Sequence, residues 1–392
     1  MSDKKRKVPK LRFPGFTDDW EQRKLGEVGS LLKETVYPSK HPDKLYHEYS
    51  MPNYDDWKTP KVVKGNSMLS NRIKIKGTVL LVNKLNVHQR RIWYVQTSFE
   101  DSVASGEFLP YISEEVNLEM LSQVLLSDSS TLDLISLSSG SSNSQKRITP
   151  EAFMKFNVMF PTDIKEQNMI AKLLNSIDKH ISLHQRKLDN VKMLKKSLLQ
   201  KLFPKDGEKI PELRFPGFTD DWEQRKLGEV TDKFDNLRIP IAAQLRASGP
   251  TPYYGANGIQ DYVDGFTHDG EFILLAEDGA NNIYDYPVHY VNGKIWVNNH
   301  AHVLQAKEGT ADNLFLLVSL KSINMEPYLV GGGRAKLNAD VMMKLPIEIP
   351  SIQEQVILGG FFNTLNNLIS LHQRKLDHLK ELKKGLLQQM FV

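Results

Sequence analysis

The feature that most constrains this chain is a long internal repeat without a single change. The sequence LRFPGFTDDWEQRKLGEV runs from Leu11 to Val28 and again from Leu213 to Val230. A second repeat, ISLHQRKLD, begins at Ile181 and again at Ile369. The copies lie much farther apart than the ~20–50 residues of a solenoid unit. The repeats therefore predict two whole domains, each preceded by the same leading segment and followed by the same helix, with divergent sequences between them.

The composition predicts a globular protein of a reducing cytosol. Apolar residues make up 40% and charged residues 25% of the 392 residues, which suffices for two or three domains with their own cores. Cysteine is absent, which excludes disulfides, thiolate chemistry and cysteine-ligated zinc. We find neither an apolar stretch near the ~18–20 residues of a membrane span nor the apolar core of a secretory signal. The net charge of +4 makes the basic character local, and the basic run 4–7 fits a solvated terminus, an import tag or a phosphate-contacting tail.

The two middle regions are expected to form compact α+β domains. Short apolar runs predict strands at 78–82, 92–95, 272–275 and 294–297, and helices are expected at 117–126 and 313–320. The predicted organisation is a tail and leading segment at 1–29, a first domain at 30–163, a first spacer helix at 164–204, a second leading segment at 205–230, a second domain at 231–351 and a second spacer helix at 352–392.

Each half ends in a long helix with a heptad seam. In the first helix, steps of four and three residues connect Ile170, Leu174, Ile177, Ile181, His184, Leu188 and Val191. The second helix repeats the spacing at Leu358, Phe362, Leu365, Ile369, His372, Leu376 and Leu379. Because a short stretch joins the end of the first helix to the second domain, the second helix must run back toward the first domain. We therefore expect an antiparallel coiled coil of two long helices that separates two domains in pseudo-twofold arrangement.

The sequence lacks the motifs of common catalytic sites. It has no G-x-x-x-x-G-K-[ST] loop, no Asn-Pro-Pro-aromatic motif and no His-Glu-x-x-His motif. The glycines at 331–333 do not follow the spacing of a dinucleotide-binding fingerprint. His300 and His302 could begin a metal site, but no third ligand follows at a typical spacing. We therefore expect a binding protein with no catalytic site and no metal of its own.

Basic and amide side chains gather in loops of both domains, as in proteins that contact phosphates and base edges. Counting back from Pro161 and Pro350, Arg147 corresponds to Lys336, so a loop with cations precedes a short helix in both halves. A solvated basic loop is the ordinary alternative for any one loop, but recurrence in both halves favours nucleic acid. In the first domain we expect DNA contacts from Arg72, Lys84, Asn86, Gln89, Arg90, Arg91, Ser144, Gln145, Lys146 and Arg147. In the second domain we expect them from Asn257, Asn299, His300, His302, Arg334 and Lys336.

Apolar residues of the repeated segments are candidates for the docking of partner proteins. Two lie on the helix seams and four in the leading segments: Leu188, Leu376, Trp20, Leu25, Trp222 and Leu227. For the four residues of the leading segments, we also expect packing against the body of their own domain.

Together these features resemble the specificity subunit of type I restriction–modification systems. The resemblance rests on the repeated Trp-x-x-x-Lys-Leu-Gly motif, the Glu-Gln pair before each long helix, and the Leu-Leu-Gln motifs at 198–200 and 386–388. Within the domains, segments 81–86 and 104–108 are similar to one class of target-recognition domain. Segments 254–258 and 296–302 are similar to another class.

The resemblance implies a non-catalytic DNA-binding subunit of the bacterial cytosol, associated with the nucleoid. Such a subunit recognises a bipartite, asymmetric site in double-stranded DNA and joins two DNA adenine methyltransferase subunits and two restriction (motor) subunits. The partners, and not this chain, would bind S-adenosylmethionine, ATP and Mg2+. The alternatives are a protein-interaction scaffold with two binding domains on a coiled coil, and a standalone endonuclease.

Overall fold

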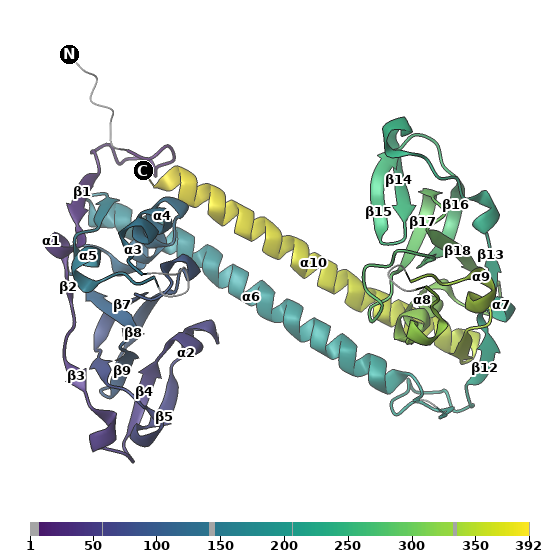
Figure 1. Cartoon of the computed structure of the whole chain (residues 1–392), viewed down its shortest axis with the longest axis horizontal. Coiled ribbons are helices and arrows are strands. Elements are labelled where there is room, and N and C mark those ends of the chain that lie inside the picture. Colours follow the sequence, from purple (N-terminus) through teal and green to yellow (C-terminus); the bar gives the residue numbers. More distant parts are fainter. Residues whose placement is uncertain (1–7, 57, 141–145, 206, 332–334, 392) are drawn as a thin grey trace. The chain divides into compact units, whose positions relative to one another are not determined.

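The computed structural model describes residues 8–56, 58–140, 146–205, 207–331 and 335–391 (Figure 1). The chain divides into two compact units, of which unit 1 comprises Met1–His184 and Lys375–Val392 and unit 2 comprises Gln185–Arg374. The two long helices, α6 (Ile164–Leu202) and α10 (Ile352–Met390), each begin in one unit and end in the other. Each unit therefore contains a part of both helices.

Besides a two-stranded sheet described below, the described part of unit 1 contains two larger sheets. The first has the antiparallel order β2-β10-β7-β8 and comprises Ser30–Leu31, Phe108–Ile112, Gly77–Asn83 and Ile92–Thr97. The second has the order β3-β6-β9-β4-β5 and comprises Thr35–Val36, Arg72–Lys74, Ser102–Ser105, Leu45–Tyr49 and Lys61–Lys64. The helices of the unit are α1 (Leu25–Val28), α2 (Met51–Asp55), α3 (Leu118–Leu125), α4 (Asp128–Leu137) and α5 (Pro150–Met154). Helix α3 packs on β7 and β8 and buries the first sheet's apolar face.

Unit 2 is built on one six-stranded sheet of order β13-β18-β16-β17-β14-β15. The strands comprise Thr231–Lys233, Ala301–Ala306, His268–Ala276, Val288–Val297, Ser248–Gly255 and Gly258–Val263. All neighbouring pairs are antiparallel except β14 and β17. The helices are α7 (Leu227–Val230), α8 (Asn313–Ser322) and α9 (Ala339–Met342), and α8 covers the core side of β16 and β17. The predicted strand segments 272–275 and 294–297 lie within β16 and β17.

The repeated leading segment forms the same structure in both units. Its short strand pairs with the strand that precedes the long helix: β1 (Glu21–Lys24) with β11 (Asn157–Phe160), and β12 (Glu223–Lys226) with β19 (Pro346–Ile349). The prediction that its apolar residues dock a partner is wrong for four of them, because their side chains fill the core of their own unit. Their exposed fractions are 3% or less for Trp20, Leu25, Trp222 and Leu227.

The glutamine of the Glu-Gln pair at the start of each long helix connects three parts of its unit by hydrogen bonds. Gln167 accepts a hydrogen bond from the backbone N–H of Asn117 at 2.8 Å, and Gln355 accepts one from the N–H of Asp312 at 3.1 Å. Asn117 and Asp312 are the N-caps of α3 and α8. The amide group of each glutamine also donates to the carbonyl of the preceding proline, at 2.8 Å and 2.9 Å. The glutamine of each pair thereby fixes α3 or α8 against the long helix of its unit.

Within each unit, the start of one long helix packs against the end of the other. In unit 1 the Lys383 ammonium lies 2.7 Å from the Asp178 carboxylate, and Met390 belongs to the same core as Ile170. In unit 2 the rings of Phe203 and Phe362 lie 6.1 Å apart, centroid to centroid. The helices are therefore antiparallel within each unit, and the expected mixed α+β fold is confirmed.

The seam residues proposed for partner docking are buried. Leu188 and Leu376 are each 1% exposed. Since a side chain already covered by the chain itself offers no surface to another protein, the prediction that these two leucines dock a partner is wrong.

Candidate nucleic-acid interface

Both units carry the same backbone arrangement at the base of the loop that was expected to contact phosphate. In unit 1, Ser139 and Arg147 exchange two backbone hydrogen bonds of 2.9 Å and 2.8 Å. In unit 2, Val330 and Lys336 do the same, at 2.9 Å and 2.8 Å. We call these two places the loop bases. The tips of the two loops, with the predicted contacts Ser144, Gln145 and Arg334, lie outside the described residues.

The residue after each cation anchors the loop base to the central sheet. Ile148 donates its N–H to the carbonyl of Lys84 at 2.9 Å, and Leu337 donates to the carbonyl of Glu277 at 2.7 Å. A short helix follows in each unit, α5 after Thr149 and α9 after Asn338. These hydrogen bonds confirm that Arg147 and Lys336 occupy corresponding positions.

In unit 1 the loop base brings several predicted contact residues together. Lys146 accepts a backbone hydrogen bond from Asn86 at 3.0 Å, and the Arg147 guanidinium lies 3.1 Å from the Glu107 carboxylate. The Arg147 side chain is 51% exposed, so phosphate could reach it. Asn86 has a left-handed backbone with φ of 55°, and its buried amide oxygen has no hydrogen-bond partner within the described structure. Backbone contacts thus bring Lys84, Asn86, Lys146 and Arg147 together at the loop base.

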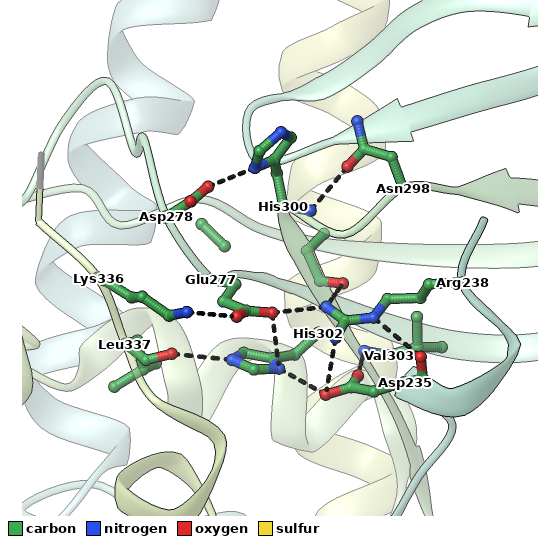
Figure 2. Close-up of polar contacts among 12 residues, drawn as sticks. Asp235, Arg238, Glu277, Asp278, Asn298, His300, His302, Val303, Lys336 and Leu337 are labelled. Carbon is green, nitrogen blue, oxygen red and sulfur yellow. Dashed lines mark hydrogen bonds and ion pairs between the residues drawn. The ribbon is translucent and has the colours of Figure 1, made fainter. Parts of the chain in front are cut away.

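In unit 2 the loop base rests on a network of charged side chains, which Figure 2 shows. The Lys336 ammonium lies 3.0 Å from one oxygen of Glu277, whose other oxygen lies 2.6 Å from the Arg238 guanidinium. Burial raises the pKa of Glu277, but the hydrogen bonds from Arg238 and Lys336 outweigh it and leave this pKa below its usual range. The carboxylate therefore stays charged and holds both cations.

His302 is buried beside this network and forms hydrogen bonds with both of its ring nitrogens. Its side chain is 1% exposed, with Nδ1 2.7 Å from Asp235 and Nε2 2.9 Å from the Leu337 carbonyl. Since a ring buried in this way cannot reach a base, the prediction that His302 binds DNA is wrong. The imidazole instead fixes the backbone next to Lys336.

Three residues of the same cluster have side-chain atoms of the kind that bind metal ions. Ligand atoms of Asp235, Glu277 and His302 lie within 4.8 Å of one another. However, Glu277 already binds two cationic side chains, and both ring nitrogens of His302 face oxygen acceptors. The Leu337 carbonyl can only accept, so Nε2 of His302 donates its proton there and has no lone pair for a metal. The residues therefore fit an ion-pair network better than a metal centre.

The other predicted residues of unit 1 are already paired with carboxylates. Arg90 lies 2.6 Å from Asp128, and Arg91 lies 2.6 Å from Asp55 and also contacts Gln89. These three residues lie together at the end of the turn 87–91. Arg72 is different, because it lies on β6 and its guanidinium, 11% exposed, binds Glu48 at 2.6 Å. The prediction of Arg72 as a DNA contact is therefore wrong, since it joins two strands of a sheet.

The remaining predicted residues of unit 2 lie around the strand ends beside the loop base. Asn257 donates to the carbonyl of Gly279 at 2.9 Å and accepts from the N–H of Asn281 at 2.9 Å, and so links two turns. The His300 ring lies 2.5 Å from the Asp278 carboxylate, as Figure 2 shows. Asn299 is exposed.

Sequence reasoning missed the carboxylates and Arg238. Glu107, Glu277 and Arg238 are each far in sequence from the cation or carboxylate that they contact. No local motif could have identified them, because their pairing depends on strand order. In the part of the chain that the structure describes, no helix has the length and apolar character needed to cross a bilayer.

Comparison with known proteins shows one consistent similarity. A family described as "Type I restriction modification DNA specificity domain" matches residues 17–193 and 219–381. A putative type I restriction enzyme specificity subunit of Haemophilus influenzae, S.HindORF215P, is 43% identical over 148 residues, which are 38% of this chain and 38% of that protein. The match thus spans about two fifths of that relative's length.

Two further comparisons extend over nearly the whole chain. The MjaVIII specificity subunit of Methanocaldococcus jannaschii is 21% identical over 422 residues, covering 96% of this chain and 92% of that protein. The crystal structure of the type I restriction–modification S subunit from M. genitalium superposes with a TM-score of 0.72 at 14% identity. It covers 98% of this chain and 99% of that one. At this identity the likeness concerns the fold.

Proposed function

Because the chain belongs to the family of type I restriction–modification DNA specificity proteins, we propose that it recognises a bipartite, asymmetric site in double-stranded DNA and directs partner subunits to it. The observation that carries this proposal is the recurrence of the loop base in both units, with Arg147 in one and Lys336 in the other. Half-exposed cations beside exposed polar groups are suited to phosphate contact.

The asymmetry of the site follows from the different sheets of the two units. Unit 1 has a four-stranded and a five-stranded sheet, whereas unit 2 has one sheet of six strands. Different scaffolds present different side chains to the DNA, so the two half-sites should differ in sequence. We propose that residues 30–163 and 231–351 are the two target-recognition domains and that the leading segments and long helices form the frame between them.

The chemistry in this proposal belongs to the partners. Two DNA adenine methyltransferase subunits would bind S-adenosylmethionine, and two restriction subunits would bind ATP and Mg2+. The chain itself would be the non-catalytic component that selects the DNA. The family assignment and the ion-paired state of the carboxylates around the loop bases support this division of labour.

Mapping of methylated adenines tests the proposal. Genomic DNA would be sequenced from cells that carry the intact locus and from cells in which this chain alone is deleted. We expect a split motif with two different halves to be methylated only when the chain is present. An unchanged methylation pattern after deletion would refute the proposal, and purified chain that cleaves DNA with Mg2+ alone would show a nuclease instead.

A further inference from the structure

At both loop bases a glutamate holds the cation, but it comes from a different backbone position in each unit. In unit 1 the carbonyl of Glu107 accepts the N–H of Lys84 at 3.0 Å. In unit 2 the carbonyl of His300 accepts the N–H of Glu277 at 2.9 Å. Lys84 therefore corresponds to Glu277, and Glu107 corresponds to His300. The glutamate therefore lies at one of two neighbouring strand ends in unit 1 and at the other in unit 2.

The contact between the glutamate and the cation is nevertheless the same in both units. A carboxylate oxygen lies 3.1 Å from the Arg147 guanidinium and 3.0 Å from the Lys336 ammonium. The two glutamates stand at different backbone positions, so the contact with the cation, and not the position of the acidic residue, is what the two loop bases share.

On the basis of the proposed function, we propose that Glu107 and Glu277 shield the loop-base cations in the DNA-free protein and thereby weaken binding to DNA that lacks the target sequence. The cations are 51% and 45% exposed, whereas the two glutamates are 28% and 14% exposed. The cation can therefore turn toward a phosphate while the carboxylate stays in place. Glu277 then retains Arg238 as its partner, at 2.6 Å.

The shielding acts on the electrostatic part of binding. Non-specific DNA binding consists almost entirely of contacts between cations and phosphates, accompanied by the release of counterions. A cation that must first leave a carboxylate gains less from a phosphate. Exposed ion pairs of this kind correspond to roughly two- to fivefold in an equilibrium constant. Target DNA adds base contacts that offset this loss, and random DNA does not.

The test is the affinity of the full-length chain for a fluorescent duplex of random sequence, measured by anisotropy between about 50 and 200 mM salt. Glu107→Gln and Glu277→Gln each remove a charge with little change in shape. We expect each variant to bind about two- to fivefold more tightly at the lower salt concentration. The slope of log K against log salt should become steeper by up to ~0.9 for each cation released.

Glu212→Gln is the matched control. Glu212 is a half-exposed carboxylate 2.8 Å from Lys201, and its loss changes the net charge by the same amount outside the loop bases. If Glu107→Gln binds random DNA no more tightly than Glu212→Gln, the shielding proposal is wrong. Glu277 also binds Arg238, so Glu277→Gln could lower the stability of the protein as well as free Lys336. If its unfolding midpoint is lowered, the DNA affinity of Glu107→Gln alone decides between the outcomes.

Two further variants separate this proposal from the proposed function. Arg147→Gln and Lys336→Gln should weaken binding to every duplex if the cations contact phosphate. If they do so while the glutamate variants match the control, only the shielding fails. If neither cation variant changes DNA affinity, the loop-base contacts fail and the shielding fails with them. A Glu107→Gln variant that loses affinity only for the target DNA would identify a base contact and would overturn the shielding role.

Discussion

Arg214 donates two hydrogen bonds to Glu354, from Nε at 2.8 Å and from Nη2 at 2.7 Å, and the carboxylate is 1% exposed. Arg12 and Glu166 form the same bidentate pair in unit 1, at 2.7 Å and 2.8 Å. Each pair joins a leading segment to the first turn of a long helix. Because both pairs involve residues that recur in the two halves of the sequence, they lie outside the two divergent middle regions.

Loss of one partner of this pair should destabilise the frame strongly. Glu354→Ala leaves the Arg214 guanidinium, 12% exposed, without its carboxylate, and we expect the free energy of unfolding to fall by about 3–5 kcal/mol. Urea denaturation measures this change. Glu223→Ala, which removes the 71%-exposed partner of Arg225, should cost less than about 1 kcal/mol. Equal losses of unfolding free energy in the two variants would show that the buried pair contributes no more to stability than the exposed pair.

The buried glutamine after each of these glutamates makes a second prediction. Gln355 is 0% exposed and connects the N–H of Asp312 to the carbonyl of Pro350. Gln355→Ala leaves both backbone groups without this partner, so the unfolding free energy should fall by about 2–6 kcal/mol, at about 1–3 kcal/mol for each buried polar group. Gln200→Ala, an exposed position on α6, is the control and should be near neutral. A loss of stability no larger than the control's would contradict the bridging role.

The sequence predicted the buried centre of each domain better than its edges. Strand β7 and helices α3 and α8 follow apolar patterns that are long enough to recognise, and they lie where they were expected. The five-stranded sheet of unit 1 escaped notice because its strands are short and polar, as in the Arg-Ile-Lys of β6. Arg72 was therefore placed in a loop, although its partner Glu48 lies on β4 of the same sheet.

The candidate site was predictable in its cations and not in its carboxylates. Arg147 and Lys336 follow small and polar residues before a helix start, which is a local pattern. Glu107 and Glu277 meet them only because two strands end beside the loop base, and no local pattern encodes that meeting. The burial of His302 was not predictable either, because the first four residues of β18 are all buried and no alternation marks the histidine as an inner residue.

Two buried histidines predict a loss of stability in mild acid. Burial lowers the pKa of His268 and of His289, and Lys321 lowers the pKa of His289 further. In the unfolded chain both imidazoles take up protons as the pH falls through about 6.5, whereas in the native state they remain neutral. The unfolded state then binds more protons, so the free energy of unfolding should decrease as the pH falls below about 6.5.

Urea denaturation between about pH 7.5 and 5.5 measures this dependence, a range that lies above the usual pKa of carboxylates. His289→Gln should reduce the slope of unfolding free energy against pH, because the ring nitrogen Nε2 of His289 is buried without a hydrogen-bond partner within the described structure. His88→Gln, at an exposed position, is the control. An unchanged slope in His289→Gln would contradict the assignment.

The shared frame makes a final prediction about DNA recognition. The repeated segments 11–28 and 213–230 are identical, and each pairs with the strand before its long helix in the same register. A second copy of residues 30–163 should therefore fit in place of residues 231–351. We expect the asymmetric target to be replaced by one in which both half-sites have the sequence that residues 30–163 recognise.

Mapping of methylated adenines in cells that carry this chimaera measures the outcome. The reciprocal chimaera, with residues 231–351 in both places, is the matched control and should give a target with two copies of the other half-site. If both chimaeras fold and direct methylation to the original asymmetric motif, the two middle segments do not determine specificity. If each gives a motif with two copies of its own half-site, the two target-recognition domains act independently on a common frame, as the repeated ion pairs and glutamine bridges suggest.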